Sequence, residues 1–585
     1  MTAISLRDER RRDWFAAIAL ALLLTACWVA RDWAQLRWFN LPDTDDMMRL
    51  AQVRDWVAGQ GFNDWTQYRL APPEGAPMHW SRINDLGPAA MLVTLTPLIG
   101  RHAAELTMVI GYPALLFVVC LFLSARLARR LGGAPAALPA ILIAALAYPA
   151  NALFLPGRID HHALQIVLLQ LAAFAVMGPG GRRSGALLGG AIALSFGVGL
   201  ETAPQALVLV GVLFVRWVVL GAGERARALG FGGALFGVTL LLVAVARPSY
   251  WTAQWCDGFT PASVAAALGA GAAWLAIGMA SPWLRDWRLR LVAGGVLGGA
   301  AVVATLLAYP ACLGGPYGPM GPFLRRAIID SIPEATGLFA QPSAAAAVQA
   351  VALLAVAAGA SLLYLRGADA DRRWAALPLA LIYAISIALT VSQLRGAYMG
   401  AAMAAPMLAQ LVLAAREAPR WRSAATLGAW CASAGVLWLV VSTEVEGRLR
   451  PAVSQSREAA KSCRDGDVWH QLDASPPGTI LTAMNHGARV IGGSHHGSVG
   501  AGYHRNNRGN RATYDFFLAA PERAREIAAA WQARYMLFCP GDFEEIGVSR
   551  DYPASLAAQL NRGAPPPWAE RIPLRDTGLQ FYRIR

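Results

Sequence analysis

Residues 153–170 read FLPGRIDHHALQIVLLQL, a polar cluster followed at once by a long apolar run. The run can enter a membrane as a helix, and it begins beside Arg158, Asp160, His161 and His162. Polar groups are costly inside a bilayer and are kept where water or a ligand reaches them. The pattern therefore predicts a membrane helix with a metal and phosphate site at its water-facing end.

The whole chain has the composition of a polytopic membrane protein. Of its 585 residues, 56% are hydrophobic and only 15% are charged, and the mean hydropathy is +0.40. Because a backbone in lipid must satisfy its polar groups internally, we predict an α-helical bundle. The net charge of +14 does not indicate a nucleic-acid partner, since the arginines fall in short clusters between apolar runs.

Apolar runs of membrane-spanning length predict about thirteen transmembrane helices. These runs lie near residues 15–31, 104–125, 134–150, 162–178, 185–200, 204–220, 228–246, 262–283, 288–309, 344–365, 373–391, 397–415 and 423–441. The first run lacks a small-residue cleavage site, so we expect a retained signal anchor.

Arginine clusters mark every second loop and set the expected orientation. They are Arg126, Arg129, Arg130, Arg182, Arg183, Arg225, Arg227, residues 285–290, Arg372, Arg373 and residues 416–422. The positive-inside rule makes these loops cytoplasmic. We therefore predict a bacterial inner-membrane protein with a cytoplasmic N-terminus. All nine histidines then fall on the outer, periplasmic face.

The same topology divides the chain into two domains. Residues 1–444 form the transmembrane domain, with long outer loops at 32–103 and 310–343. Residues 445–585 lie outside the membrane and alternate short apolar runs with the helical pattern APERAREIAAAWQA. That alternation predicts a small α/β domain in the periplasm.

Two sequence segments offer ligands for a divalent cation. In FNLPDTDDMMRLAQVRDWVAGQGF, residues 39–62, we prefer Asp45, although Asp43 or Asp45 can instead cap a helix that begins near Met47. Asp160 and His162 are one residue apart and can chelate one ion, which suits Mn²⁺ and, less well, Mg²⁺. The alternative there is a pair of interfacial histidines after an aspartate cap.

Two further polar residues lie in or beside the outer loops. Glu334 is in RRAIIDSIPEATGLF, within the long loop before the tenth span, where a lone glutamate is usually solvated. Arg395 lies between two apolar spans, where an unpaired guanidinium is expensive, so a lipid phosphate is a natural partner. The alternatives for Arg395 are snorkelling to the interface and a salt bridge to a carboxylate.

The seven cysteines show no metal-ligand spacing. Those in or beside spans are expected to pack as small apolar residues; they are Cys27, Cys120, Cys256, Cys312 and Cys431. Cys463 and Cys539 both fall in the C-terminal domain. Two states are open for this pair: a disulfide, if the domain is extracytoplasmic, or two free thiols.

These features together resemble the catalytic subunits of oligosaccharyltransferases. The shared pattern is an acidic motif in the first outer loop, Asp-x-His in the second, a long outer loop before the tenth span and an external C-terminal domain. The resemblance implies a GT-C membrane glycosyltransferase fold. It covers the whole chain in topology but is confined to short motifs in sequence.

The resemblance also implies roles for individual residues. Asp45, which precedes the Arg-Asp pair of VRDWV, would bind Mn²⁺ or Mg²⁺ together with Asp160 and His162. Glu334 would be the acceptor-loop glutamate, which orients or deprotonates the acceptor. Arg395, and Arg158 beside the second motif, would bind the phosphates of a polyprenyl-linked glycan donor.

One departure concerns the acceptor. The family carries Trp-Trp-Asp-Tyr-Gly in its external domain, and the nearest match here is AMNHGARVI. This argues against the usual Asn sequon and favours a lipid-linked glycan, a surface polysaccharide or another protein site. His486, His504 and Arg505 are candidates for the acceptor groove, with solvated loop residues as the alternative. The blocks TQYRLAPPEGAPMHWSRINDL and GYHRNNRG resemble uncharacterised bacterial relatives and receive no role.

The sequence thus predicts a metal-dependent glycosyltransferase that acts at the outer face of the bilayer. One alternative is a transferase that uses a polyprenyl monophosphate donor to add a monosaccharide to lipid A or a polysaccharide. The other alternative is a transporter or flippase, although the sequence shows no internal repeat.

Overall fold

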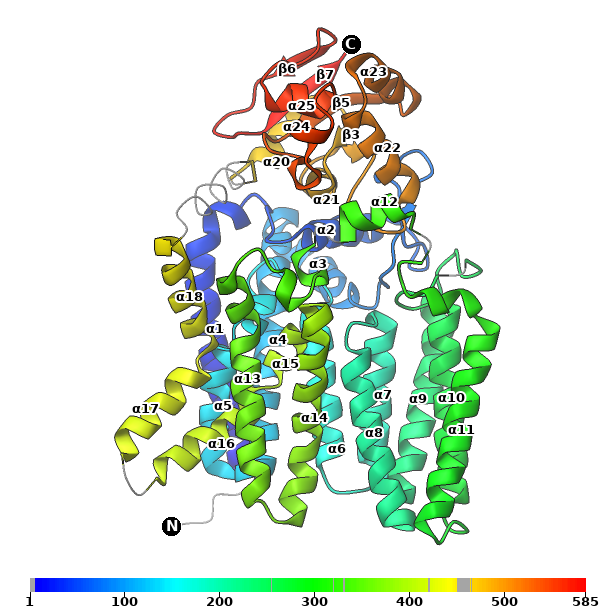
Figure 1. The fold of residues 1–585 in the computed structure, drawn as a ribbon, viewed down its shortest axis with the longest axis vertical. Coiled ribbons are helices and arrows are strands. Elements are labelled where there is room, and N and C mark those ends of the chain that lie inside the picture. Colours follow the sequence, from blue (N-terminus) through cyan, green and yellow to red (C-terminus); the bar gives the residue numbers. More distant parts are fainter. Residues whose placement is uncertain are drawn as a thin grey trace.

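The computed structural model describes residues 6–253, 255–318, 320–329, 332–418, 421–449, 463–464 and 466–585. A long helical bundle carries a mixed α/β domain at one end, and helix α2 lies between the two (Figure 1). The bundle with a small C-terminal α/β part agrees with the fold class expected from the sequence.

Each apolar run lies on one helix or on a pair of helices. The bundle helices are α1 (Leu6–Leu36), α4 (Arg101–Gly132), α5 (Ala137–Ala145), α6 (His162–Met177), α7 (Arg182–Val198), α8 (Ala203–Leu220), α9 (Arg225–Ala246), α10 (Pro261–Ala280), α11 (Trp287–Ala308), α13 (Ala344–Gly367), α14 (Ala370–Ser392), α15 (Arg395–Ala402), α16 (Ala405–Arg416), α17 (Arg422–Ser433) and α18 (Gly435–Leu449).

The expected number of thirteen spans is not confirmed. By length and composition, the described residues offer 7 stretches that could cross a membrane, or up to 9 if each bent helix pair is one span. The pairs α15–α16 and α17–α18 bend by 55° and 77°, and helices such as α6 are shorter than a full span.

The arginine-rich loops gather at the end of the bundle away from the α/β domain (Figure 1). Arg227 donates hydrogen bonds to the carbonyl oxygens of Val176 and Gly178, at 3.1 and 2.7 Å, and so joins two of these loops. Near the start of α1, Asp13 pairs with Arg129 at the end of α4 at 2.7 Å. The loops therefore share one end, while their placement in the cytoplasm stays a prediction.

The first outer loop folds into four short elements: α2 (Thr44–Val57), β1 (Thr66–Gln67), β2 (Ala76–Pro77) and α3 (Leu86–Ile99). The Asp43 side chain caps α2 by accepting from the Asp45 amide. Arg49 of α2 is buried, forms a 3.0 Å salt bridge with Asp85 and lies over the ring of Trp80. The loop block around Trp80 thus fixes α2.

A five-stranded sheet forms the centre of the C-terminal domain. Its strands are β3 (Thr479–Thr482), β4 (Gly497–Ser498), β5 (Ala533–Phe538), β6 (Ala569–Ile572) and β7 (Gln580–Ile584), in the order β4-β3-β5-β7-β6. β3 pairs in parallel with β4 and β5, whereas β7 is antiparallel to β5 and β6. The helices are α20 (Val468–Gln471), α21 (Met484–Gly493), α22 (Asn507–Leu518), α23 (Pro521–Ala530), α24 (Val548–Asp551) and α25 (Leu556–Asn561).

Helix α21 joins the C-terminal domain to α2. A Cβ atom on Gly492 would lie 2.3 Å from the carbonyl oxygen of Met47, so only glycine allows this close approach. Arg489 donates to the carbonyl oxygens of Leu41 and Pro42, both at 3.0 Å. The domain therefore holds the segment that immediately precedes Asp43. The proposed boundary between residues 444 and 445 stays a prediction.

The described part of the chain contains two disulfides. Cys463–Cys539 settles the pair that the sequence left open. Cys256–Cys312 shows that the expected apolar packing of these two residues is wrong. Cys256 precedes α10 and Cys312 follows α11, and both helix ends lie on the same side because the two helices are consecutive and packed. The bond links the loop before α10 to the long outer loop.

Candidate active site

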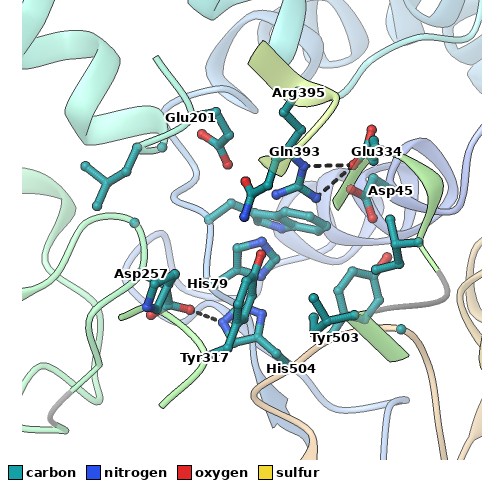
Figure 2. Close-up of a pocket in the computed structure, with 18 of the residues that line it drawn as sticks. Asp45, His79, Glu201, Asp257, Tyr317, Glu334, Gln393, Arg395, Tyr503 and His504 are labelled. Carbon is teal, nitrogen blue, oxygen red and sulfur yellow. Dashed lines mark hydrogen bonds and ion pairs between the residues drawn. The ribbon is translucent and has the colours of Figure 1, made fainter. Parts of the chain in front are cut away.

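A cavity of about 910 Å³ lies between the helical bundle and the C-terminal domain. Figure 2 shows side chains from distant parts of the chain pointing into it. Its polar lining residues include Asp43, Asp45, His79, Glu201, Asp257, Tyr317, Glu334, Gln393, Arg395, Arg464, Asn485, Arg489, Tyr503 and His504. The sequence predictions Asp45, Glu334, Arg395 and His504 are thus brought together.

One wall of the cavity carries two carboxylates and a guanidinium. Glu334, in the 3-10 helix η6 (Pro333–Ala335), accepts from Arg395 Nε and Nη2 at 3.1 and 2.8 Å (Figure 2). Arg395 is the first residue of α15, where free backbone amides and the helix dipole also favour an anion. The salt bridge that the sequence left as an alternative for Arg395 is therefore formed.

Asp45 points into the same part of the cavity, and no salt bridge joins it to another described residue. Burial, together with the charges of Asp43, Asp160 and Glu334, raises the pKa of Asp45 to about 7. An ionised Asp45 is thus unfavourable here unless a cation accompanies it.

Close to this wall, the guanidinium of Arg158 forms salt bridges with three carboxylates. Arg158 contacts Asp43 at 2.8 Å, Asp46 at 3.2 Å and Asp160 at 2.7 Å. Asp46 also accepts from the backbone amides of Ile159 and Asp160, at 2.9 and 3.0 Å. The two motif loops are therefore clasped together, with more negative than positive charge. Arg158 is committed to carboxylates and does not line the cavity.

The predicted cation ligands are neighbours, but they do not form a tight cluster. Asp160 and His162 are buried and do not line the cavity, whereas Asp45 does. Within the described residues, the groups whose ligand atoms lie within 4.8 Å of one another are Asp473–His495–His496 and His486–Cys539–Asp542. Cys539 is in a disulfide and cannot ligate as a thiolate. The metal site stays a prediction.

The residues present nevertheless suit a divalent cation. The Nδ1 atom of His162 is buried and has no hydrogen-bond partner among the described residues. Asp45 and Asp160 supply hard oxygen ligands from the two loops that Arg158 joins through Asp43 and Asp160. Mixed carboxylate and imidazole ligation of this kind fits Mn²⁺ or Mg²⁺.

The opposite wall carries a histidine and an aspartate. Nε2 of His504 donates to Asp257, which also accepts from Arg505 Nε and Nη2 at 3.0 and 2.8 Å. The rings of His79 and Tyr317 lie 4.8 and 5.3 Å from that of His504, between centroids (Figure 2). Arg505 supports Asp257 but does not itself line the cavity.

One predicted site residue lies outside the cavity, and two residues that were not predicted line it. His486 is buried against Asp542 and Trp469 and does not line the cavity, so its acceptor role stays a prediction without support from this placement. Glu201 and Asp257, which the sequence did not single out as site residues, both line it. Glu201 accepts a hydrogen bond from His161 at 3.0 Å. The signal in the sequence that could have identified Glu201 is a single carboxylate in the short segment GLE between two apolar runs.

Replacing Asp257 with asparagine is expected to destabilise the protein in a pH-dependent way. Burial would raise the pKa of Asp257, but the hydrogen bond from His504 and the charge of Arg505 outweigh it and lower the pKa below its usual range. The ionised form therefore adds stability above pH ~4, and this is lost as the pH falls through the folded pKa.

Thermal unfolding of the detergent-purified protein tests this at two pH values. At pH 7 we expect Asp257→Asn to cost about 3–5 kcal/mol, because it leaves Arg505 buried without its counter-charge. In acid the difference from the wild type should shrink. Equal melting temperatures at pH 7 would show that the pair contributes nothing.

Comparison with solved structures reveals one recurring fold. The apo crystal structure of the Archaeoglobus fulgidus oligosaccharyltransferase superposes with a TM-score of 0.64 and 14% identity, over 91% of this chain and 71% of that chain. The chain has an oligosaccharyltransferase fold. The complex of archaeal AglB with an inhibitory peptide and a dolichol-phosphate gives a TM-score of 0.63 at 13% identity, over 92% and 71%. No protein-family model and no curated protein sequence matches this chain.

The same archaeal enzyme has been solved with zinc and sulfate, and tethered to an acceptor peptide that contains the NVT sequon. These structures match 92% and 89% of this chain, with TM-scores of 0.61 in both cases and identities of 13% and 15%. The oligosaccharyltransferase fold expected from the sequence is thus confirmed at the level of architecture.

Proposed function

We propose that this chain is a membrane glycosyltransferase that moves a sugar or oligosaccharide from a polyprenyl-(di)phosphate donor to an acceptor at the periplasmic face of the inner membrane. The observation that carries the proposal is the grouping of Asp45, Glu334 and Arg395 in one cavity, on an oligosaccharyltransferase fold. A polyprenyl-linked sugar cannot leave the bilayer. The side chains that act on its headgroup must therefore lie at the end of the helical bundle, where the headgroup emerges.

Arg395 would bind the donor phosphate. Its guanidinium and the amino end of α15 both favour an anion, and bidentate hydrogen bonds to phosphate are strong. Without donor, Arg395 is held by Glu334. A phosphate that takes Arg395 would release the Glu334 carboxylate, which is then free to orient the acceptor. The salt bridge therefore couples donor binding to preparation of the acceptor side.

Asp45, Asp160 and His162 would hold Mn²⁺ or Mg²⁺ beside the phosphate. A bound divalent cation neutralises the charge that develops on a phosphate leaving group. Arg158 and Asp46 keep the two ligand-bearing loops together. Since no protein nucleophile is required, we expect direct displacement with inversion at the anomeric carbon.

The archaeal neighbours support a lipid-phosphate donor. Archaeoglobus fulgidus AglB was solved with a dolichol-phosphate and an inhibitory peptide, and an oligosaccharyltransferase of the same organism was solved with zinc and sulfate. These ligands fit the chemistry proposed here for a phosphate beside a cation. The acceptor is not carried over, because AMNHGARVI lacks the family's Trp-Trp-Asp-Tyr-Gly motif.

The disulfides support an extracytoplasmic location for this chemistry. Cys256–Cys312 lies beside the cavity and Cys463–Cys539 lies in the C-terminal domain. Disulfides persist in the periplasm and are rare in the cytoplasm. We therefore place the cavity and the C-terminal domain in the periplasm, with the arginine-rich loops in the cytoplasm.

Deletion of the gene in the organism that encodes the chain tests the proposed function. Cells without the protein are expected to accumulate a polyprenyl-linked sugar and to lose one glycoconjugate, and the wild-type gene should reverse both changes. Mass spectrometry of lipid extracts measures the accumulated donor. Unchanged lipid-linked sugars together with unchanged glycoconjugates would refute glycosyl transfer.

A further inference from the structure

We propose that His504 is the general base of the transfer reaction and that the acceptor atom is the oxygen of an alcohol hydroxyl. The inference rests on the proposed function and names its acceptor class. It starts from the wall of the cavity opposite Glu334 and Arg395, where His504, Asp257 and Tyr317 come together (Figure 2).

The geometry fixes which ring nitrogen of His504 is available. A carboxylate only accepts, so the contact between Nε2 and Asp257 makes Nε2 the protonated nitrogen. Nδ1 then carries the lone pair. An aspartate that holds one nitrogen of a histidine so that the other can take a proton is the arrangement of hydrolase triads.

Arg505 gives the pair its charge balance. It binds both oxygens of Asp257, at 2.8 and 3.0 Å, so that Arg505, Asp257 and a neutral His504 together carry no net charge. Asp257 is only 6% exposed and His504 only 7%. The group is therefore held in place, as a base that must act on one bound substrate requires.

Three parts of the chain converge on this base. His504 comes from the C-terminal domain, and Asp257 from the loop before α10. Cys256, next to Asp257, is bonded to Cys312 of the long outer loop, which brings Tyr317 against His504. That outer loop also carries Glu334, and its Ala327 carbonyl oxygen accepts a hydrogen bond from the Tyr514 hydroxyl of α22 at 3.2 Å. The base and the proposed acceptor-orienting residue thus belong to one linked framework.

An alcohol acceptor needs a general base, because its hydroxyl must lose a proton as the oxygen attacks. An amide acceptor is different, because its nitrogen is almost non-basic. The acceptor oxygen forms a bond to the anomeric carbon of the donor while the bond between that carbon and the phosphate oxygen breaks. The bonding pair leaves with the phosphate. The hydroxyl proton passes to Nδ1 of His504, and a positioned base of this kind contributes about 100- to 10,000-fold in rate.

The surrounding rings suit a hydroxyl-bearing ligand. His79, Tyr317 and Tyr503 line the cavity around His504, and the Nδ1 atom of His79 is buried without a hydrogen-bond partner among the described residues. An unpaired buried nitrogen costs free energy that a second hydroxyl of the acceptor would recover. A sugar or a hydroxyamino acid both present this chemistry.

The test uses the full-length chain in cells that lack the chromosomal gene. We compare wild type, His504→Ala and Asp257→Asn, with Arg508→Gln as the matched control, because Arg508 pairs with Glu74 on the exposed surface away from the cavity. Size-exclusion chromatography of the purified variants reports folding. The readouts are the glycoconjugate, the accumulated lipid-linked sugar and the linkage atom, all by mass spectrometry.

His504→Ala is expected to remain folded, to lose about 100-fold or more of the conjugate and to accumulate the donor. Imidazole added to the medium should restore part of the transfer, which a purely structural histidine would not allow. Asp257→Asn should lose part of the activity, while Arg508→Gln should behave as the wild type. The linkage should be O-glycosidic, to a sugar if the acceptor is a glycan or to Ser, Thr or Tyr if it is a protein.

An N-glycosidic product would overturn the proposal, as would a folded His504→Ala variant with full transfer or with a loss that imidazole leaves unchanged. Each of these results leaves the proposed glycosyl transfer intact, provided that the deletion strain accumulates donor. If that strain accumulates none and loses no conjugate, the proposed function fails first and this inference fails with it.

Discussion

Asp45→Asn is expected to reduce glycosyl transfer by about 100-fold or more while leaving the fold intact. Asp45 points into the cavity and makes no salt bridge with another described residue, so its carboxylate has no counter-charge to lose there. Its negative charge is needed only if a cation is bound. Transfer is measured as conjugate formed per amount of purified or membrane-embedded protein.

Asp55→Asn is the matched control for this prediction. Asp55 also lies on α2, contacts Gln67 and Arg69, and does not line the cavity. Asp160→Ala should abolish transfer too, but Asp160 is buried against Arg158, so some of its effect can come from stability. If Asp45→Asn transferred sugar as well as Asp55→Asn, Asp45 would not be a cation ligand.

Arg395→Ala is expected to lower transfer about 10- to 100-fold, with a large part of the loss appearing as weaker donor binding. The substitution removes charge-assisted hydrogen bonds to phosphate, each worth about 1.5–3 kcal/mol. Arg395→Lys should recover little, because an ammonium cannot reproduce the bidentate fork. Kinetics at varied donor concentration separate KM from kcat.

The variant Glu334→Gln tests whether Arg395 binds phosphate or only forms a structural salt bridge. It removes the carboxylate that holds Arg395 in the donor-free state, so donor affinity should stay equal or rise while transfer falls. Parallel losses of donor affinity in Arg395→Ala and Glu334→Gln would indicate that the salt bridge is structural. Donor affinity unchanged in Arg395→Ala would remove Arg395 from the phosphate site.

The helical bundle could be predicted because apolar runs of membrane-spanning length have few other uses. The short helix α3 was missed, since its 14 residues with Pro97 fall below the length of a span. The bends between α15 and α16 and between α17 and α18 were missed as well, because a hydropathy pattern carries no direction.

The predictable part of the candidate site came from the resemblance and from single polar residues in the outer loops. Asp45, Glu334, Arg395 and His504 were named and line one cavity. Asp257 was not named, because its role depends on a contact with His504, which lies in a distant part of the sequence. The Cys256–Cys312 disulfide was missed for the same reason: only the packing of α10 against α11 brings those loop ends together.

The most direct test of the central claim is an anomalous diffraction map of the wild-type protein crystallised with Mn²⁺. We predict a manganese peak bound by carboxylate oxygens of Asp45 and Asp160 and by a ring nitrogen of His162, at roughly 2.0–2.6 Å. No peak at these residues at saturating Mn²⁺, or a peak only at Asp473 and His495 in the C-terminal domain, would contradict it.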